Sequence, residues 1–194
     1  GSSNFTFNGE GIFFESASVG EQTLLGGDGD DTIYVGNVSG IIDGGNGNDT
    51  IDYSVASGVV IDLGEASPQN TVSSGLDTIL NVENIIGSDD ADVITGSAKN
   101  NTIIAGDGDD IVKVSLGDDV IIGGFGFDTL DYSLSQFPIN ADLEIGTVTD
   151  PTGKTDRISE FESLIGSQLA DAITGSDNDD IIIGGLDKDT IDGG

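Results

Sequence analysis

Five nine-residue units follow one another without a gap from Gly87 to Asp131: GSDDADVIT, GSAKNNTII, AGDGDDIVK, VSLGDDVII and GGFGFDTLD. Their first six positions hold mostly glycine, serine and acidic residues, which favour a turn. The eighth position is aliphatic in every unit: Ile94, Ile103, Val112, Ile121 and Leu130. One inward aliphatic side chain in nine residues cannot be buried within its own unit, so the units must stack on one another. The stretch therefore predicts an all-β solenoid with a thin shared core.

Further copies of the unit lie on both sides of this stretch. They are GGDGDDTIY, VGNVSGIID and GGNGNDTID over residues 26–52, VSSGLDTIL over 72–80, and GSQLADAIT, GSDNDDIII and GGLDKDTID over 166–192. The units resemble the nonapeptide G-G-x-G-x-D-x-U-x of the RTX, or haemolysin-type calcium-binding, repeat family. The resemblance implies a parallel β-roll, or β-helix solenoid, in which two nonapeptides form one coil. It also implies calcium ions between turns that are stacked one coil, or eighteen residues, apart.

Glycine and acidic residues dominate the composition. The 194 residues include 31 glycines and 36 acidic residues against 5 basic ones, which gives a formal net charge of -31. Two carboxylates about 4 Å apart repel each other by roughly 4 kcal/mol at an effective dielectric constant near 20. Stacked acidic turns therefore need a cation between them. We expect this cation to be Ca²⁺, because calcium accepts six to eight oxygen ligands in a tolerant geometry. We expect about five or more such ions.

The composition also excludes several functions. The few Lys and Arg residues do not form the basic patch that nucleic-acid binding requires. The chain contains no cysteine and no histidine, so it offers neither thiolate chemistry nor a tetrahedral zinc site with those ligands. No apolar run approaches the roughly 18 residues of a membrane span.

Each turn should present one carboxylate and several backbone carbonyls to the ion, and glycine adopts the positive φ angles that such a turn requires. Pairing sixth positions eighteen residues apart predicts five sites: Asp31 with Asp49, Asp92 with Asp110, Asn101 with Asp119, Asp110 with Asp128, and Asp171 with Asp189. The remaining sixth-position candidates are Asp77, Asp156 and Asp180. The expected carbonyl donors are Gly27, Gly29, Gly45, Gly47, Gly106, Gly108, Gly124 and Gly126. The motif is imperfect at Asp187, which stands where the second turn glycine belongs.

Two shorter, six-residue steps each contain a glutamate. They are NVENII, with Glu83, and EFESLI, with Glu162. Glu83 precedes Asn101 by eighteen residues and Glu162 precedes Asp180 by the same interval. Our hypothesis is that both are longer-armed metal ligands in place of a motif aspartate. The alternative is that they are solvated charges on the edge of a strand.

A longer repeat lies over the nonapeptides. DTIDYS at 49–54 and DTLDYS at 128–133 are offset by 79 residues, and the register lapses after both. We expect N-terminal strands and a degenerate capping coil at 1–25, with Phe5, Phe7, Phe13 and Phe14 covering an open end. A roll at 26–131 should carry an insertion at about 53–71, and residues 132–194 should form the second copy. Tyr53 and Tyr132 are expected to pack inside, the alternative being a carbohydrate platform. The ninth-position acids Asp52, Asp131 and Asp192 are expected to be solvated.

The resemblance implies a non-enzymatic, calcium-dependent structural module of a larger secreted or cell-surface bacterial protein, such as a toxin, surface-layer protein, adhesin or exoenzyme. Export by a type I secretion system, folding on calcium outside the cell and contact with neighbouring domains are expected, and surface polysaccharide is a possible further partner. We interpret the chain as a fragment of that protein. The alternative is a module of a polysaccharide-active enzyme, with Asp62, Glu65, Asp142 and Glu144 as the acids outside the repeats, or a ligand-binding adhesin segment.

Overall fold

The computed structural model describes residues 3–6, 12–13, 22–36, 39–71 and 75–194, and these residues form strands in three sheets. In spatial order, the first sheet contains β1 (Ser3–Thr6), β3 (Gln22–Asp28), β5 (Gly40–Asn46), β9 (Leu76–Leu80) and β8 (Gln69–Asn70). The second contains β2 (Ile12–Phe13), β4 (Thr32–Tyr34), β6 (Thr50–Asp52), β10 (Asn84–Ile86), β12 (Thr102–Asp107), β14 (Val120–Phe125), β18 (Thr155–Ser159), β17 (Thr147–Thr149), β16 (Asn140–Asp142), β20 (Ala172–Thr174) and β22 (Thr190–Asp192). The third contains β21 (Ile181–Ile183), β19 (Ser163–Ile165), β15 (Thr129–Asp131), β13 (Ile111–Lys113), β11 (Val93–Thr95) and β7 (Val60–Asp62).

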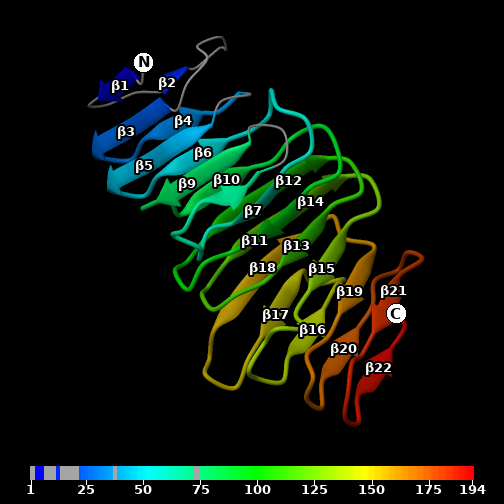
Figure 1. Cartoon of the computed structure of the whole chain (residues 1–194). Helices are drawn as coiled ribbons and strands as arrows, with labels where there is room; N and C mark the ends of the chain where they lie inside the picture. Colours follow the sequence, from blue (N-terminus) through cyan, green and yellow to red (C-terminus); the bar gives the residue numbers. More distant parts are fainter. Residues whose placement is uncertain (1–2, 7–11, 14–21, 37–38, 72–74) are drawn as a thin grey trace.

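Successive repeat strands alternate between two walls. The first wall consists of the first and third sheets, which meet where the Asp62 N–H donates to Gln69 Oε1 at 2.7 Å. The second sheet is the second wall. Strands within a wall pair in parallel at an interval of eighteen residues, as in Thr32 with Thr50 and Val93 with Ile111. Figure 1 shows the coils stacked along one axis, with β1 and β22 at opposite ends. The predicted β-roll with two nonapeptides per coil is confirmed.

The core is the thin layer between the two walls. The eighth-position aliphatics fill it: Ile33, Ile42, Ile51, Ile94, Ile103, Val112, Ile121 and Leu130 are each at most 2% exposed. Because side chains alternate along a strand, short strands such as β11 and β13 bury their central residue and turn its neighbours outward. The buried side chains form one continuous cluster from Leu24 to Ile173.

Each lapse in the nonapeptide register is a detour within a wall. After β6 the chain runs ahead to β7, which pairs with β11 of a later coil, and returns through β8 to β9 beside β5. The second lapse repeats this path with β16, β17 and β18 beside β14. The segments in which the nonapeptide register lapses therefore contain the antiparallel strands β8 and β17 in addition to β7 and β16.

The 79-residue repeat exchanges the two walls. One unit spans β5 to β13, and because β7, β8 and β9 share a wall, the chain changes wall seven times between β5 and β14. This odd number of changes places the next copy on the opposite wall. Thus β9 lies in the first wall, whereas its counterpart β18 lies in the second. The two detours consequently lie on opposite faces of the roll.

Several smaller expectations are settled by burial. Tyr53 and Tyr132 are 0% and 4% exposed, which confirms that they pack inside. Asp52 was wrongly expected to be solvated, since it is buried and its Oδ1 accepts the Ser54 N–H at 2.9 Å. Strands are present around Phe5 and Phe13, whereas Phe7 and Phe14 lie outside the described residues.

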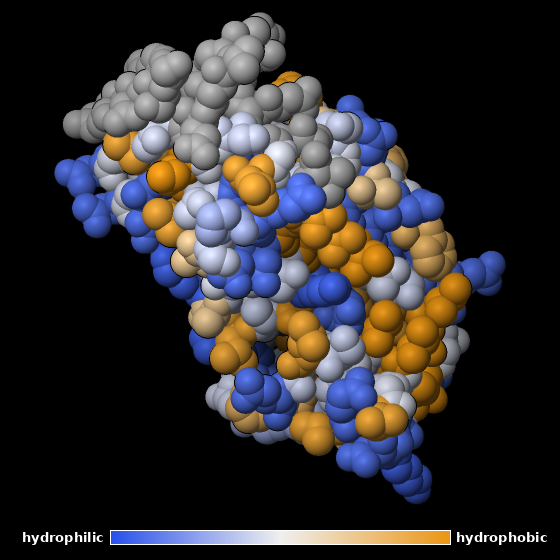
Figure 2. Space-filling model, viewed as in Figure 1, coloured by the Kyte–Doolittle hydropathy of each residue, from blue (hydrophilic) through white to orange (hydrophobic). Residues whose placement is uncertain are grey.

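The outer surface is mixed in character. Figure 2 shows a hydrophobic patch over the later strands of the first wall, where Ile181 and Ile183 of β21 are about half exposed. Within the described part of the chain, no helix has the length and apolar character needed to cross a membrane.

Candidate metal centre

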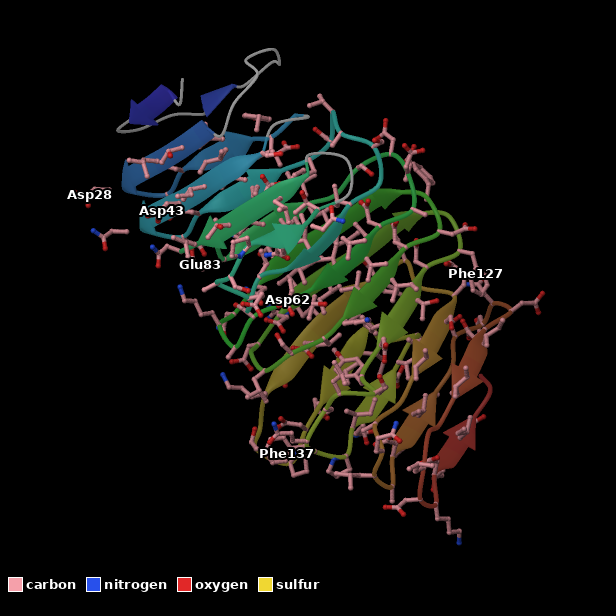
Figure 3. The ribbon with its side chains drawn as sticks, viewed as in Figure 1. Asp28, Asp43, Asp62, Glu83, Phe127 and Phe137 are labelled. Atoms are coloured by element: carbon pink, nitrogen blue, oxygen red, sulfur yellow. The ribbon has the colours of Figure 1, made fainter. Side chains whose placement is uncertain are left out.

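The turns form two columns, one along each edge of the roll. The first column leads into the second wall and contains turns 26–31, 44–49, 81–83, 96–101, 114–119, 166–171 and 184–189. The second column leads into the first wall and contains turns 87–92, 105–110, 123–128, 160–162 and 175–180. Figure 3 shows Asp28, Asp43 and Glu83 along one edge and Phe127 at the opposite edge. Turns 26–31 and 44–49 lie in the first column. Because successive copies of the 79-residue unit lie on opposite walls, their counterparts, turns 105–110 and 123–128, lie in the second column.

A ladder of hydrogen bonds runs along each column. In the first column the Asp31 N–H donates to Asp49 Oδ1 at 2.8 Å, and in the second the Asp110 N–H donates to Asp128 Oδ1 at 2.9 Å. The pairs Asp92 with Asp110, Asn101 with Asp119, and Asp171 with Asp189 are joined in the same way. The structure therefore brings together all five predicted pairs. Each bond uses only one oxygen of the accepting carboxylate.

Four turns leave the second oxygen without a partner. The Oδ2 atoms of Asp31, Asp49, Asp110 and Asp128 are buried and accept no hydrogen bond in the described structure. A buried polar atom without a partner costs about 1–3 kcal/mol, and more when it is charged. We call turns 26–31, 44–49, 105–110 and 123–128 the open turns. Their orphaned oxygens favour an electropositive ligand.

Backbone carbonyls lie next to these orphaned oxygens. A methyl group on Gly26 would collide with the Gly44 carbonyl oxygen and lie 2.8 Å from Asp31 Oδ2. A methyl group on Gly44 would likewise collide with the Asn81 carbonyl and lie 2.6 Å from Asp49 Oδ2. In these two turns, and in turn 123–128 beside the Glu160 carbonyl, one point is thus bordered by the turn's own carboxylate and by a carbonyl of the next coil. This set of hard oxygen donors fits calcium.

Glycine shapes the open turns. The second and fourth positions have φ between +105° and +153°, a region that side chains rarely adopt: Gly27, Gly29, Gly45, Gly47, Gly106, Gly108, Gly124 and Gly126. The sheet ladder continues through the second glycine, because Gly27 pairs with Gly45 and Gly106 pairs with Gly124. Asp187 itself has a φ of +62°, so turn 184–189 keeps a left-handed fourth position despite its imperfect motif.

Several of the other predicted ligands have their second oxygen engaged by the protein. Asp77 Oδ2 accepts the Thr71 hydroxyl at 2.5 Å, and Asp156 Oδ2 accepts the Tyr132 hydroxyl at 2.7 Å. In turns 87–92, 96–101, 166–171 and 175–180 the second residue is serine, and its N–H donates to the side-chain oxygen of Asp92, Asn101, Asp171 or Asp180. We call these the serine turns. In the sequence, the open turns begin with Gly-Gly or Ala-Gly and the serine turns begin with Gly-Ser. The nonapeptide pattern alone did not indicate that this difference affects the carboxylate.

The two glutamates end the runs of open turns. The Asp49 N–H donates to Glu83 Oε2 at 2.9 Å, and the Asp128 N–H donates to Glu162 Oε2 at 2.8 Å. Each glutamate therefore takes the place that the next motif aspartate would occupy. The tight turns have positive φ at Asn81 and Glu160, and the carbonyls of these two residues border Asp49 Oδ2 and Asp128 Oδ2. The sequence predicted the interval from Glu83 to Asn101, but it did not indicate the contact with Asp49.

Burial perturbs the turn carboxylates. It raises the pKa of Asp110 to about 7, with further contributions from the charges of Asp92 and Asp128. Burial also raises the pKa of Asp119 to about 7, and the pKa values of Asp49 and Asp128 shift in the same direction for the same main reason. A carboxylate that is desolvated and faces other carboxylates favours protonation or a cation.

No group of three or more acidic side chains in the described part of the chain is arranged to hold a metal ion. The open turns instead combine a single carboxylate with main-chain carbonyls. Stacked turns that offer such oxygens along both edges of a parallel β-roll define a calcium-binding repeat module.

The profile of the RTX calcium-binding nonapeptide repeat family matches residues 17–38, 41–54, 86–116, 115–130 and 165–194. These segments cover more than half of the chain and leave out the two detours. The chain belongs to this family, whose repeats bind Ca²⁺. A search of curated proteins found no match.

Proposed function

We propose that this chain is a calcium-folded structural module of a larger secreted or cell-surface bacterial protein. The observation that carries the proposal is the set of four buried, unpartnered carboxylate oxygens in the open turns. Without a cation these oxygens and a formal net charge of -31 oppose folding. With calcium, the same oxygens become ligands.

The open turns suggest at least four ions. One would lie between turns 26–31 and 44–49, and one between turn 44–49 and the tight turn with Glu83. Their counterparts would lie between turns 105–110 and 123–128, and between turn 123–128 and the tight turn with Glu162. Turn 184–189 offers a further half-site with Asp189. Asp31, Asp49, Asp110 and Asp128 would supply carboxylates, and the turn glycines, Asn81 and Glu160 would supply carbonyls.

The expected calcium affinities, compared with the calcium concentrations inside and outside the cell, favour folding outside the cell. Calcium sites of extracellular modules have dissociation constants of about 10⁻⁴–10⁻³ M. Calcium at 100 times the dissociation constant stabilises the folded state by about 2.7 kcal/mol per site. Four such sites together approach the whole stability of an ordinary domain, about 5–15 kcal/mol. Submicromolar cytosolic calcium would contribute almost nothing, so the chain would remain unfolded until it leaves the cell.

Circular dichroism tests the proposal directly. The chain should be largely unfolded after calcium is removed with EDTA, and it should gain β-sheet signal cooperatively when calcium is added. Magnesium at the same concentration should substitute poorly, because it demands a small octahedral site and retains its waters. A spectrum that is the same with EDTA and with calcium would refute the proposal.

A further inference from the structure

We infer that a Gly-Ser pair in the first two positions of a turn makes that turn independent of calcium, and that Ser88, Ser97, Ser167 and Ser176 thereby confine the ions to the open turns. Turn 114–119 begins Val-Ser instead, and its Ser115 hydroxyl donates to the Ser97 carbonyl rather than to Asp119. The inference rests on the proposed function, since it concerns which turns the ions occupy. It narrows the ligand set that the sequence predicts by removing Asp92, Asn101, Asp171 and Asp180.

The serine satisfies the oxygen that the open turn leaves orphaned. The Ser88 N–H donates to Asp92 Oδ2 at 2.6 Å, and the Ser88 hydroxyl donates to Oδ1 at 2.9 Å. The Ser167 N–H and hydroxyl make the same two bonds to Asp171, at 2.6 and 2.7 Å. The aspartate of a serine turn therefore has both oxygens engaged within the protein, whereas the aspartate of an open turn leaves its Oδ2 without a partner.

The serine hydroxyl also closes the rest of the turn. It accepts the N–H of the fourth residue, at 3.2 Å from Asp90 in the first serine turn and at 3.0 Å from Leu169 in its counterpart. The fourth position then needs no glycine, and Asp90, Lys99, Leu169 and Asn178 occupy it without a positive φ. A serine turn therefore lacks the positive φ angles that an open turn has at its second and fourth positions.

The serine N–H acts where the ion would act in an open turn. A methyl group on Gly87 would collide with both the Ala105 carbonyl oxygen and Asp92 Oδ2, so the same two oxygens meet there as in an open turn. In the serine turn, however, Asp92 Oδ2 already accepts a short hydrogen bond from Ser88. A cation at that point would have to compete with a donor that is fixed by the backbone.

Asn101 provides independent support. Its Oδ1 accepts the Ser97 N–H at 2.7 Å, and its Nδ2 donates to the Glu83 carbonyl at 2.6 Å and to Ser97 Oγ at 3.0 Å. A neutral amide thus completes a serine turn, and its N–H group binds a carbonyl of the preceding coil. A turn that folds around an amide does not depend on a charge at the sixth position.

The order of turns is the same in both copies of the 79-residue unit. Two open turns, at 26–31 and 44–49, are followed by the tight turn with Glu83 and then by the serine turns 87–92 and 96–101. The second copy repeats this order at 105–110, 123–128, Glu162, 166–171 and 175–180. Each unit therefore joins a pair of calcium-dependent turns to a pair of turns that the protein closes by itself.

A matched pair of variants tests the inference. Asp92→Asn and Asp110→Asn each remove one carboxylate from a sixth position of the second column, and Asn101 shows that a serine turn accepts an amide there. By equilibrium dialysis of the whole chain, Asp92→Asn should bind as many calcium ions as the parent, whereas Asp110→Asn should bind one fewer. Loss of an ion from Asp92→Asn would overturn the inference. Retention of every ion by Asp110→Asn would instead overturn the ligand set of the proposed function.

A gain-of-site variant keeps the inference testable if Asp92→Asn does not fold. Ser88→Gly combined with Asp90→Gly restores the glycine spacing of an open turn while Asp92 remains. This double variant should bind one calcium ion more than the parent, and Ser88→Ala, which keeps the N–H and a non-glycine residue, should bind the parental number. A parental count in the double variant would show that serine does not decide occupancy.

Discussion

At the scale of single residues, the second oxygen of the turn carboxylate separates the sites from their neighbours. Asp49 and Asp156 both accept a backbone N–H through Oδ1. Asp156 directs its other oxygen to the Tyr132 hydroxyl, whereas that of Asp49 is buried without a partner. A sequence motif that records only Asp cannot distinguish these two situations, because the partner comes from a residue outside the nonapeptide.

The glutamates give a residue-scale prediction. Glu83→Gln and Glu162→Gln should each remove one bound calcium ion, because Gln keeps the side-chain shape and loses the charge beside Asp49 or Asp128. Isothermal titration calorimetry on each variant measures the stoichiometry. Unchanged stoichiometry and affinity in both variants would assign the glutamates a purely structural role, as acceptors for the N–H groups of the two aspartates.

Lys99 supplies the matched control for this prediction. Its ammonium group forms an ion pair with Glu83 Oε1, whereas the equivalent position beside Glu162 is Asn178. A fixed positive charge competes with a cation for the same carboxylate. Lys99→Gln should therefore tighten calcium binding at the Glu83 site and leave the Glu162 site unchanged.

At the scale of the turn, glycine is required for two reasons. One is its positive φ angle, and the other is the close approach of successive coils, which leaves no room for a β-carbon. Gly29 and Gly45 have nearly equal φ, +110° and +105°. A β-carbon on Gly29 would meet nothing within 4 Å, whereas one on Gly45 would collide with the Gly27 backbone. Gly29→Ala should cost about 1–3 kcal/mol, the range for a non-glycine residue held in the left-handed region. Gly45→Ala should cost clearly more, because backbone must also move.

Urea unfolding of both variants in saturating calcium measures this difference. The parent chain provides the reference, and the free energy of unfolding is compared at the same calcium concentration. Equal losses for the two variants would mean that φ strain alone accounts for the glycine, and that the coils can separate without cost.

How much the sequence could predict differs between the strands and the turns. The eighth-position aliphatics, such as Ile94 and Ile121, predicted the core and the eighteen-residue stacking, because a side chain that must be buried has only one place in a two-walled roll. The contact between Asp49 and Glu83 was not predictable, since it joins residues 34 positions apart across a detour. The wall exchange was also missed, because it follows from how many times the chain changes wall within 79 residues, and each detour keeps three strands in one wall.

At the scale of the whole molecule, the roll is nearly one-dimensional. Each coil pairs with the coils on either side of it, and its core residues touch those of its neighbours. In such a stack, stability is approximately a sum of terms for each repeat and for each interface between neighbours. The two pairs of open turns lie in different coils and on opposite edges. Ions at one pair should therefore stabilise mainly their own part of the roll.

Hydrogen exchange on two double variants tests this consequence. In saturating calcium, Asp31→Asn with Asp49→Asn should reduce amide protection in β4 and β6 and leave β13 and β15 protected. Asp110→Asn with Asp128→Asn should expose β13 and β15 instead, because each double variant loses the ions that offset carboxylate repulsion in its own coils. The serine turns between the two pairs, at 87–92 and 96–101, should limit the spread of unfolding, since their hydrogen bonds require no ion. Uniform loss of protection along the chain in either variant would mean that the roll folds as a single cooperative unit.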